Sequence, residues 1–232
     1  MAIKYTWFGH SAFEVEIDGH KVLFDPFITG NPLAPVAHDA LDPELIFLSH
    51  AHGDHLGDTV AIATRTGAPV ISNVEITRWL GAHGVTHTQG MNSGGSHSFD
   101  FLTVKFTDAV HSSSFPDGSY GGNPNGFIVT ARQSGQRLYY AGDTSLFSDM
   151  ELIGDERIDV AFLPIGDHFT MGVADSIRAI RYIRPRFVVP MHYNTMPLIA
   201  QDASGWANRV SSETNAVPVV LDPGGSFTIP GV

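Results

Sequence analysis

The segment His50-Ala51-His52-Gly53-Asp54-His55 places four metal-ligand side chains within six residues. It follows the apolar stretch 45–48, which predicts a buried strand, and precedes residues 56–65, whose apolar spacing predicts a helix. Because strand side chains alternate, the first two histidines leave the backbone in the same direction. The glycine permits a turn before the aspartate and the last histidine. A solvated polar loop is the alternative, but such a loop has no need to follow a buried strand.

Further metal-ligand candidates follow other predicted strands. His111 comes after residues 99–107, Asp143 after 137–141, and His192 after 187–191. Each alone is weak evidence, because a lone histidine is usually a hydrogen-bonded structural residue and Gly-Asp-Thr commonly caps a helix. All three residues follow a predicted strand, and this agreement strengthens the prediction that each is a ligand. A metal site needs more ligands than one loop supplies.

The composition limits both the class of protein and the chemistry of a metal site. The chain has 232 residues, 43% of them hydrophobic and 16% charged, which is typical of a globular protein. Without cysteine it can form no disulfide and offer no thiolate, so a transition metal must be held by imidazole and carboxylate. The net charge of −11 disfavours a nucleic-acid or anionic-membrane partner. No apolar run is long enough to span a bilayer, and residues 1–8 lack a signal-peptide core, so we expect a cytoplasmic protein.

Strands and helices are predicted to alternate along the chain. Strands are expected at 3–8, 12–17, 20–24, 45–48, 70–71, 99–107, 126–132, 137–141, 158–163 and 187–189, with a terminal pair at 217–221 and 226–229. Helices are expected at 56–65, at 74–83 between caps Asn73 and Gly84, along an apolar stripe from 173 to 180, and at 203–213. The long polar loop 112–125 is predicted to be functional or mobile.

This order predicts one α/β (α+β) domain over residues 1–232. No stretch is rich enough in linker residues to divide the chain. Each half begins with a β-rich stretch and closes with helices. Two mixed β-sheets packed face to face with helices outside is the most economical arrangement, since each sheet then buries both faces.

The motifs resemble those of the metallo-β-lactamase-fold hydrolases over nearly the whole chain. Residues 50–55 match the family signature HxHxDH, and Asp25, His111, Asp143 and His192 match its other four motifs in order and kind. The opening 8–11 and the segment 166–172 look like a small bacterial branch of metal-dependent hydrolases that is similar to the ascorbate-phosphate lactonases.

The resemblance implies a four-layer αββα sandwich with a two-metal site on one edge. One ion would be held by His50, His52 and His111, the other by Asp54, His55 and His192, and Asp143 would bridge them. Two divalent cations are implied, zinc first, with manganese, iron or nickel accepting the same donors. Asp25 is expected behind the ligands, where a carboxylate orients histidines. Its alternative is a turn residue before Pro26.

The resemblance also implies metal-assisted hydrolysis, in which a hydroxide bridging the two ions attacks the substrate. Asp54 is expected to orient that nucleophile or take its proton. His10 and His168 are pocket candidates that could donate to a substrate oxygen or protonate a leaving group. The alternative for His168 is a surface pair with Asp167. We expect the remaining histidines to be solvated: His20, His38, His83, His87 and His97.

The shared site does not select a substrate, because the fold hosts many hydrolytic reactions. The acidic chain and its short length favour a small ester, lactone or phosphoester, admitted under the loop 112–125. The alternatives are a metal-binding or regulatory protein without turnover, or a phosphodiesterase or nuclease-type member of the fold. The expected partners are a small-molecule substrate and a second copy of the chain in a homo-oligomer.

Overall fold

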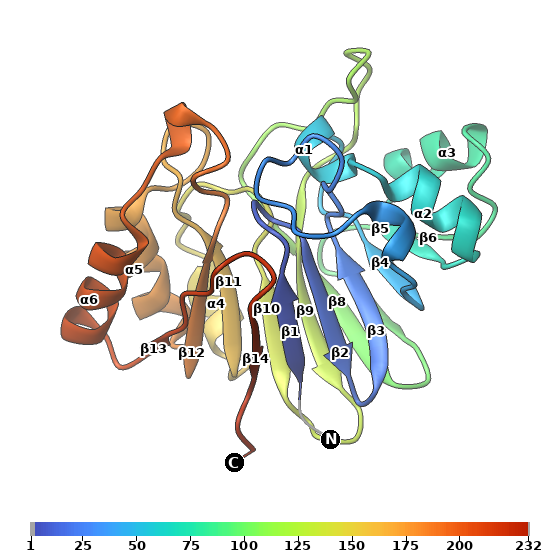
Figure 1. Ribbon diagram of the computed structural model, residues 1–232. Coiled ribbons are helices and arrows are strands. Elements are labelled where there is room, and N and C mark those ends of the chain that lie inside the picture. The colour runs from blue at the N-terminus through green and yellow to red at the C-terminus, as the bar shows by residue number, and fades with distance from the viewer. Residues whose placement is uncertain (1–2, 232) are drawn as a thin grey trace.

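Two β-sheets lie face to face at the centre of the molecule. The computed structural model describes residues 3–231, and within that range each sheet has seven strands (Figure 1). From edge to edge the first sheet contains β14 (Ser226–Thr228), β1 (Lys4–Trp7), β2 (Phe13–Ile17), β3 (His20–Phe24), β4 (Leu45–Phe47), β5 (Val70–Asn73) and β6 (Thr88–Met91). The second contains β13 (Val217–Pro218), β12 (Phe187–Met191), β11 (Val160–Pro164), β10 (Arg137–Tyr140), β9 (Asn125–Ala131), β8 (Leu102–Asp108) and β7 (Ser96–Ser98).

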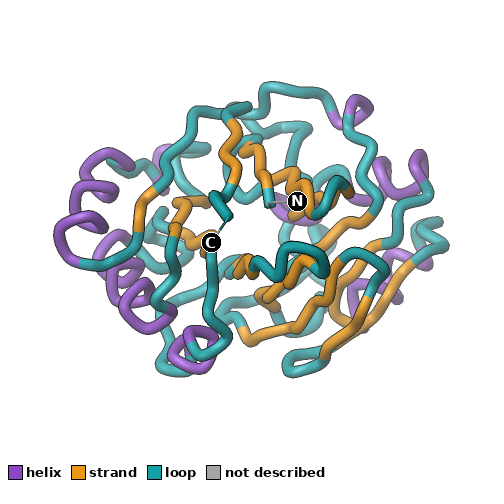
Figure 2. The backbone as a smooth tube through the Cα atoms, turned by 90° about the horizontal axis from the view of Figure 1, so that it is seen from below, coloured by secondary structure: helices purple, strands orange, loops and turns teal. Residues whose placement is uncertain are grey.

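The helices are α1 (Gly53–Leu56), α2 (Thr59–Thr66), α3 (Val74–Ala82), α4 (Met150–Gly154), α5 (Val173–Ile183) and α6 (Ala203–Glu213), with short 3₁₀ turns at His38–Ala40 and Pro197–Ile199. The short α1 lies at one edge of the sandwich, above the strand ends (Figure 1). Figure 1 shows α2 and α3 beside the first sheet and α5 and α6 beside the second, and Figure 2 shows the strands between the two groups of helices. The predicted αββα sandwich of two mixed sheets is therefore confirmed.

Each sheet has an antiparallel half and a parallel half, and this arrangement determines where the strands end. In the first sheet β14, β1, β2 and β3 are antiparallel, whereas β3 to β6 are parallel. In the second, β7 to β10 are antiparallel and β10 to β13 are parallel. The carboxyl ends of β3, β4, β10 and β12 consequently point to one edge of the sandwich, where the connecting loops gather.

The core between the sheets is rich in aromatic side chains. Strand β2 alternates between buried and half-buried residues, as a strand with one face in a core must. Its Phe13 meets Phe162 of the opposite sheet edge to face, with ring centroids 4.6 Å apart. On the outside, α5 buries Ile177, Ile180 and Ile183 and leaves its arginines in solvent, as its apolar stripe predicts.

The structure differs from the sequence prediction at the helix that follows the histidine motif. The predicted helix 56–65 begins only at Thr59, as α2, and a separate short helix, α1, lies on the motif itself at Gly53–Leu56; Gly57 and Asp58 separate the two. Gly57 has a φ of +42° and packs against the backbone of Pro26. The carboxylate of Asp58 accepts hydrogen bonds from the backbone N–H groups of Ile28 and Thr29. Both residues hold a loop that is distant in sequence, which periodicity does not reveal.

Two predicted strand regions also differ from the structure. The expected terminal pair does not form, because β13 joins β12 in one sheet and β14 joins β1 in the other. The predicted strand 99–107 begins at Leu102, and its apolar start forms the turn after β7. Strands β6 and β7 and the short helix α4 escaped prediction. Among residues 3–231, no helix has both the length and the apolar character to cross a bilayer.

The packing of Gly57 gives a test of the fold at the motif. An alanine Cβ at Gly57 would lie 2.6 Å from the Cα of Phe27, whereas a Cβ at Gly67, also at positive φ (+75°), would meet nothing within 4 Å. We expect Gly67→Ala to lower the free energy of unfolding by about 1 kcal/mol through backbone strain alone. Gly57→Ala should cost roughly 3 kcal/mol or more, since backbone must move as well. Urea unfolding of both variants measures the difference, and equal costs would contradict the close packing of α1 on the 26–28 loop.

Candidate metal centre

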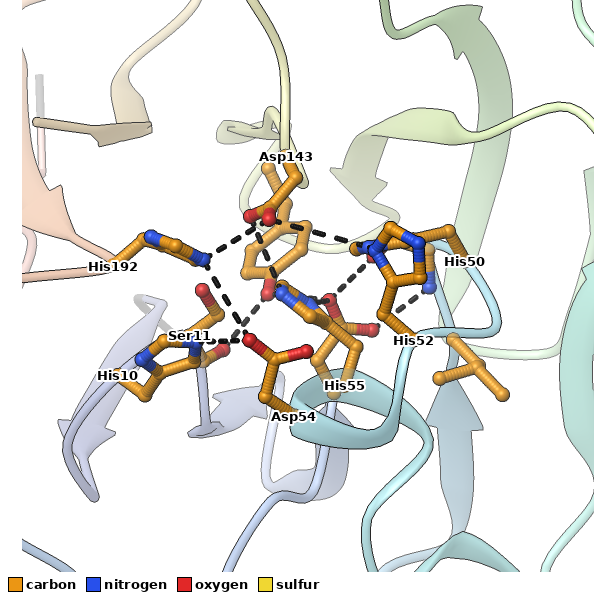
Figure 3. Close-up of polar contacts among 12 residues, drawn as sticks. His10, Ser11, His50, His52, Asp54, His55, Asp143 and His192 are labelled. Atoms are coloured by element: carbon orange, nitrogen blue, oxygen red, sulfur yellow. Dashed lines mark hydrogen bonds and ion pairs between the residues drawn. The ribbon is translucent and has the colours of Figure 1, made fainter. Parts of the chain in front are cut away.

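The predicted ligands come together at the edge where the strand ends gather. His50, His52, Asp54 and His55 lie on the turn after β4 and on α1, and the others follow β8, β10 and β12. Figure 3 shows six of these side chains pointing toward one another: His50, His52, Asp54, His55, Asp143 and His192. Two groups of donors can be distinguished, and one carboxylate lies between them.

The first group contains three imidazoles. One ring nitrogen from each of His50, His52 and His111 lies within 4.8 Å of the others. His50 is fully buried, and its Nε2 is 3.0 Å from Nδ1 of His52. Burial lowers the pKa of all three residues, which favours neutral rings. The neutral imidazole is the form that binds metal ions.

The second group combines imidazoles with a carboxylate. Donor atoms of His10, Asp54, His55 and His192 also lie within 4.8 Å of one another. Oδ2 of Asp54 is 3.2 Å from Nε2 of His10 and 3.9 Å from Nε2 of His192. Burial would raise the pKa of Asp54, but the hydrogen bond from His10 and the nearby His55 hold it well below its ordinary value.

Asp143 lies between the two groups. Its Oδ2 is 3.0 Å from Nε2 of His192 on one side and 3.6 Å from Nε2 of His111 on the other, as Figure 3 illustrates for His192. Its Oδ1 is 3.2 Å from Nε2 of His55. A single carboxylate can therefore contact donors of both groups.

The donor set fits divalent cations. Nε2 of His55 and Oδ1 of Asp143 are buried and face each other, yet neither has a hydrogen-bond partner among the described residues. Buried polar atoms are rarely left unpaired, so their orientation toward a common point is what a cation between them would require. Nitrogen and oxygen donors without sulfur suit zinc, manganese, iron or nickel.

Asp25 holds two of the imidazoles from behind. Its fully buried carboxylate accepts hydrogen bonds from the backbone N–H and the hydroxyl of Ser49 and from the hydroxyl of Tyr140, at 2.5 to 2.8 Å. Nδ1 of His55 lies 2.7 Å from the same carboxylate, and Nδ1 of His50 lies 3.0 Å from the Ser49 hydroxyl. Donation from both Nδ1 atoms leaves both Nε2 atoms free to face the centre. The role of Asp25 in orienting metal ligands stays a prediction.

Comparisons with known proteins identify the family. A family model described as the β-lactamase superfamily domain matches residues 20–193. The chain is 46% identical over 226 residues to a UPF0173 metal-dependent hydrolase of Deinococcus radiodurans, with 96% of this chain and 97% of the relative covered. The chain belongs to this hydrolase family of the β-lactamase superfamily.

Another member of the UPF0173 family, from Symbiobacterium thermophilum, is 48% identical and covers 99% of this chain and 100% of its own length. Among solved structures, Igni18, a metallo hydrolase from Ignicoccus hospitalis, aligns with a TM-score of 0.91 at 40% identity and covers 99% of both chains. The predicted family resemblance and the expectation of a metal-dependent hydrolase are therefore confirmed.

The structure places the two pocket histidines of this UPF0173 member differently. His10 is fully buried beside the second donor group, and its Nδ1 is 2.6 Å from the hydroxyl of Thr195. Burial lowers the pKa of His10 to about 4. His168 is exposed, with its ring against Phe169, and within residues 3–231 it forms no hydrogen bond or ion pair with the donor groups. The histidines expected to be solvated also lie outside these groups in the described part of the chain.

Three residues that support the site escaped the sequence analysis: Ser49, Tyr140 and Thr195. Ser49 directly precedes the histidine motif, and Tyr140 and Thr195 each lie three residues from a candidate ligand. Hydroxyl residues beside ligand motifs are the signal that could have identified them.

The contacts of Asp25 predict its effect on metal affinity. Asp25→Asn removes the carboxylate that orients His50 and His55, so we expect zinc affinity to fall about 10- to 100-fold. Competition with a chromogenic chelator measures this change. Asp42→Asn is the matched control, since Asp42 is an exposed carboxylate that precedes β4 and pairs with Arg65. Equal affinities of both variants would contradict the orienting role.

A second prediction concerns protons. Burial would lower the pKa of His55, but the carboxylates of Asp143 and Asp25 raise it well above its ordinary value. In the metal-free protein these carboxylates favour the doubly protonated ring, in which Nε2 also carries a proton, and a cation at Nε2 must displace that proton. We expect zinc binding to release about one proton from His55 and to tighten as pH rises toward that raised pKa. Calorimetry in buffers of different ionisation enthalpy measures the release, which should decrease in Asp25→Asn. Unchanged release in that variant would assign the proton elsewhere.

Proposed function

We propose that this protein is a dinuclear metal-dependent hydrolase of small esters, lactones or phosphoesters. The observation that carries the proposal is the position of the Asp143 carboxylate, which contacts both the three-histidine group and the mixed group. A carboxylate with this position suits two cations that share one ligand.

The proposed ligands follow the two groups. His50, His52 and His111 would hold one cation, Asp54, His55 and His192 the other, and Asp143 both. Zinc is the first choice of metal for these donors, with manganese, iron or nickel as alternatives. Cations bound there would polarise a substrate oxygen and lower the pKa of bound water near neutrality.

The chain's own residues orient the reacting groups. Asp54 is 29% exposed, so its carboxylate is accessible to substrate and water while the hydrogen bond with His10 holds Oδ2. If the Thr195 hydroxyl donates to Nδ1 of His10, then Nε2 carries the proton and donates to Asp54. We propose that Asp54 orients the attacking water or accepts its proton. His10 is then a positioning residue, and His168 would contact substrate from the exposed turn at residues 167–169.

Charge and composition support the remaining assignments. A chain with a net charge of −11 suits a small-molecule substrate better than nucleic acid. We propose that residues 1–232 act as one domain in the cytoplasm, and that copies of the chain associate.

The role of Asp54 predicts the outcome of its substitution. Asp54→Ala in zinc-loaded protein should lower kcat at least about 100-fold on the best substrate of a phosphodiester, lactone and thioester panel. The free energy of unfolding of metal-free protein should change little, because the carboxylate is partly exposed. Elemental analysis accompanies each assay, and retained turnover at full metal content would contradict the role.

The same panel distinguishes the alternatives. Hydrolysis of bis-p-nitrophenyl phosphate above all other substrates would favour a phosphodiesterase or nuclease-type enzyme. If zinc-loaded wild-type protein hydrolysed no substrate of the panel, a metal-binding or regulatory protein would be favoured. Lactone or ester turnover that disappears on chelation is the result expected from the proposal.

A further inference from the structure

A cavity opens beside the candidate metal centre at His111. It has a volume of about 490 Å³, and its lining includes Asp108, Phe147 and Asp149. The ring of His111 is 13% exposed, with Nε2 toward Asp143, so one residue contacts both the donor cluster and the cavity. Because of this continuity, a substrate whose reacting bond lies at the cluster can extend into the cavity.

A second, smaller cavity of about 180 Å³ continues from the first. The two share Asp108, Phe147 and Asp149 in their walls. Beyond these residues the second cavity is lined mainly by apolar side chains of β8, β9 and α4, including Ile128 and Leu152. We call the two cavities together the His111 groove. It begins at the metal centre and ends in an apolar recess between the second sheet and α4.

The charges along the groove are negative. Asp108 and Asp149 are both exposed in its wall. The one lysine in the lining, Lys105, is paired with Glu156 at 2.8 Å. A substrate arm in this groove therefore meets two carboxylates and no cation that is free to neutralise an anionic group.

The loops around the candidate metal centre also lack cationic side chains. The chain contains no lysine, arginine or glutamate in the segments 8–12, 25–34, 49–58, 108–124, 141–149, 165–172 and 192–202. Large apolar side chains are instead exposed on these loops: Val110, Tyr120, Phe169, Met196 and Leu198. Sites that bind phosphate or carboxylate groups usually supply arginine or lysine for them. The surroundings of this site supply apolar contact and aspartate.

We propose that the His111 groove binds the apolar acyl arm of an ester or lactone that carries no anionic group, which rests on the proposed hydrolase function. Cations at the centre attract negative charge at the reacting end of any substrate. The groove therefore discriminates only against anionic groups on the substrate arm, because the arm lies beside Asp108 and Asp149. Phosphorylated and carboxylated arms are excluded by repulsion, and longer alkyl arms gain affinity by burial against the recess.

Chain length tests the apolar recess. In zinc-loaded protein, kcat/KM for p-nitrophenyl esters should rise from acetate to hexanoate by up to about fourfold per methylene. Leu152→Glu places a charge in the recess at a position that is 66% exposed and tolerates a polar side chain. It should reduce kcat/KM for the hexanoate at least tenfold and leave the acetate unchanged. Leu198→Glu is the matched control, since Leu198 is similarly exposed (60%) but does not line the groove.

The terminal group tests the charge. p-Nitrophenyl butyrate and p-nitrophenyl hydrogen succinate differ in a terminal methyl against a carboxylate. In wild type, kcat/KM for the butyrate should exceed that for the succinate at least about tenfold. Asp149→Asn should reduce this ratio. A preference for the succinate, or a chain-length effect that Leu152→Glu does not alter, would overturn the proposal.

A binding measurement separates this inference from the proposed function. p-Nitrophenyl hexyl ether has no bond that the proposed chemistry cleaves, and its affinity can be measured by calorimetry. Binding to wild type that weakens at least tenfold in Leu152→Glu supports the groove even if no ester or lactone is hydrolysed, a result that would contradict the function alone. Hydrolysis of the esters together with equal ether binding by both proteins would overturn the groove and leave the function standing.

Discussion

The buried carboxylate of Asp25 is the interaction on which the site depends. It is fully buried after β3 in the first sheet and accepts a hydrogen bond from Tyr140 of β10 in the second. A carboxylate in such a place is costly unless several donors compensate for the loss of water. Ser49, Tyr140 and His55 supply these donors, and in doing so they tie the turn after β4 to both sheets. The same hydrogen bonds to Asp25 therefore hold the two sheets together and orient the candidate ligands.

The topology of the sheets explains why ligands from distant parts of the chain meet. Each sheet has an antiparallel half and a parallel half, so the carboxyl ends of several strands open on one edge. Aromatic side chains fill the space between the sheets and keep their separation constant. Loops at that edge can then vary in sequence without moving the strand ends.

The helix after the motif and the two terminal strands show where sequence reasoning fails. Residues 56–65 have a helical pattern, but Gly57 and Asp58 serve a contact with the loop after Asp25, and the helix breaks there. Strands β13 and β14 look like a local pair, yet each hydrogen-bonds to a strand distant in sequence, β12 and β1. Edge strands β6 and β7 are polar and partly exposed, so they lack the apolar alternation by which strands are recognised. The errors at the helix and at the two terminal strands share one cause, since the residues that decide these structures are remote in the chain.

The sequence by itself determined the fold class, the family and the set of candidate ligands, because ligand type and spacing after buried strands are local properties. Only the tertiary structure brought the two predicted sets of ligands within reach of Asp143 and added His10 to the mixed group. It also revealed that Ser49 and Tyr140 donate hydrogen bonds to Asp25 behind the candidate ligands, that Thr195 contacts the buried His10 beside Asp54, and that His168 is exposed. The cavity beside His111 could not be read from the chain either, since its walls come from strands, loops and a helix that meet only after folding. Distances between groups far apart in sequence are set by the packing of the two sheets.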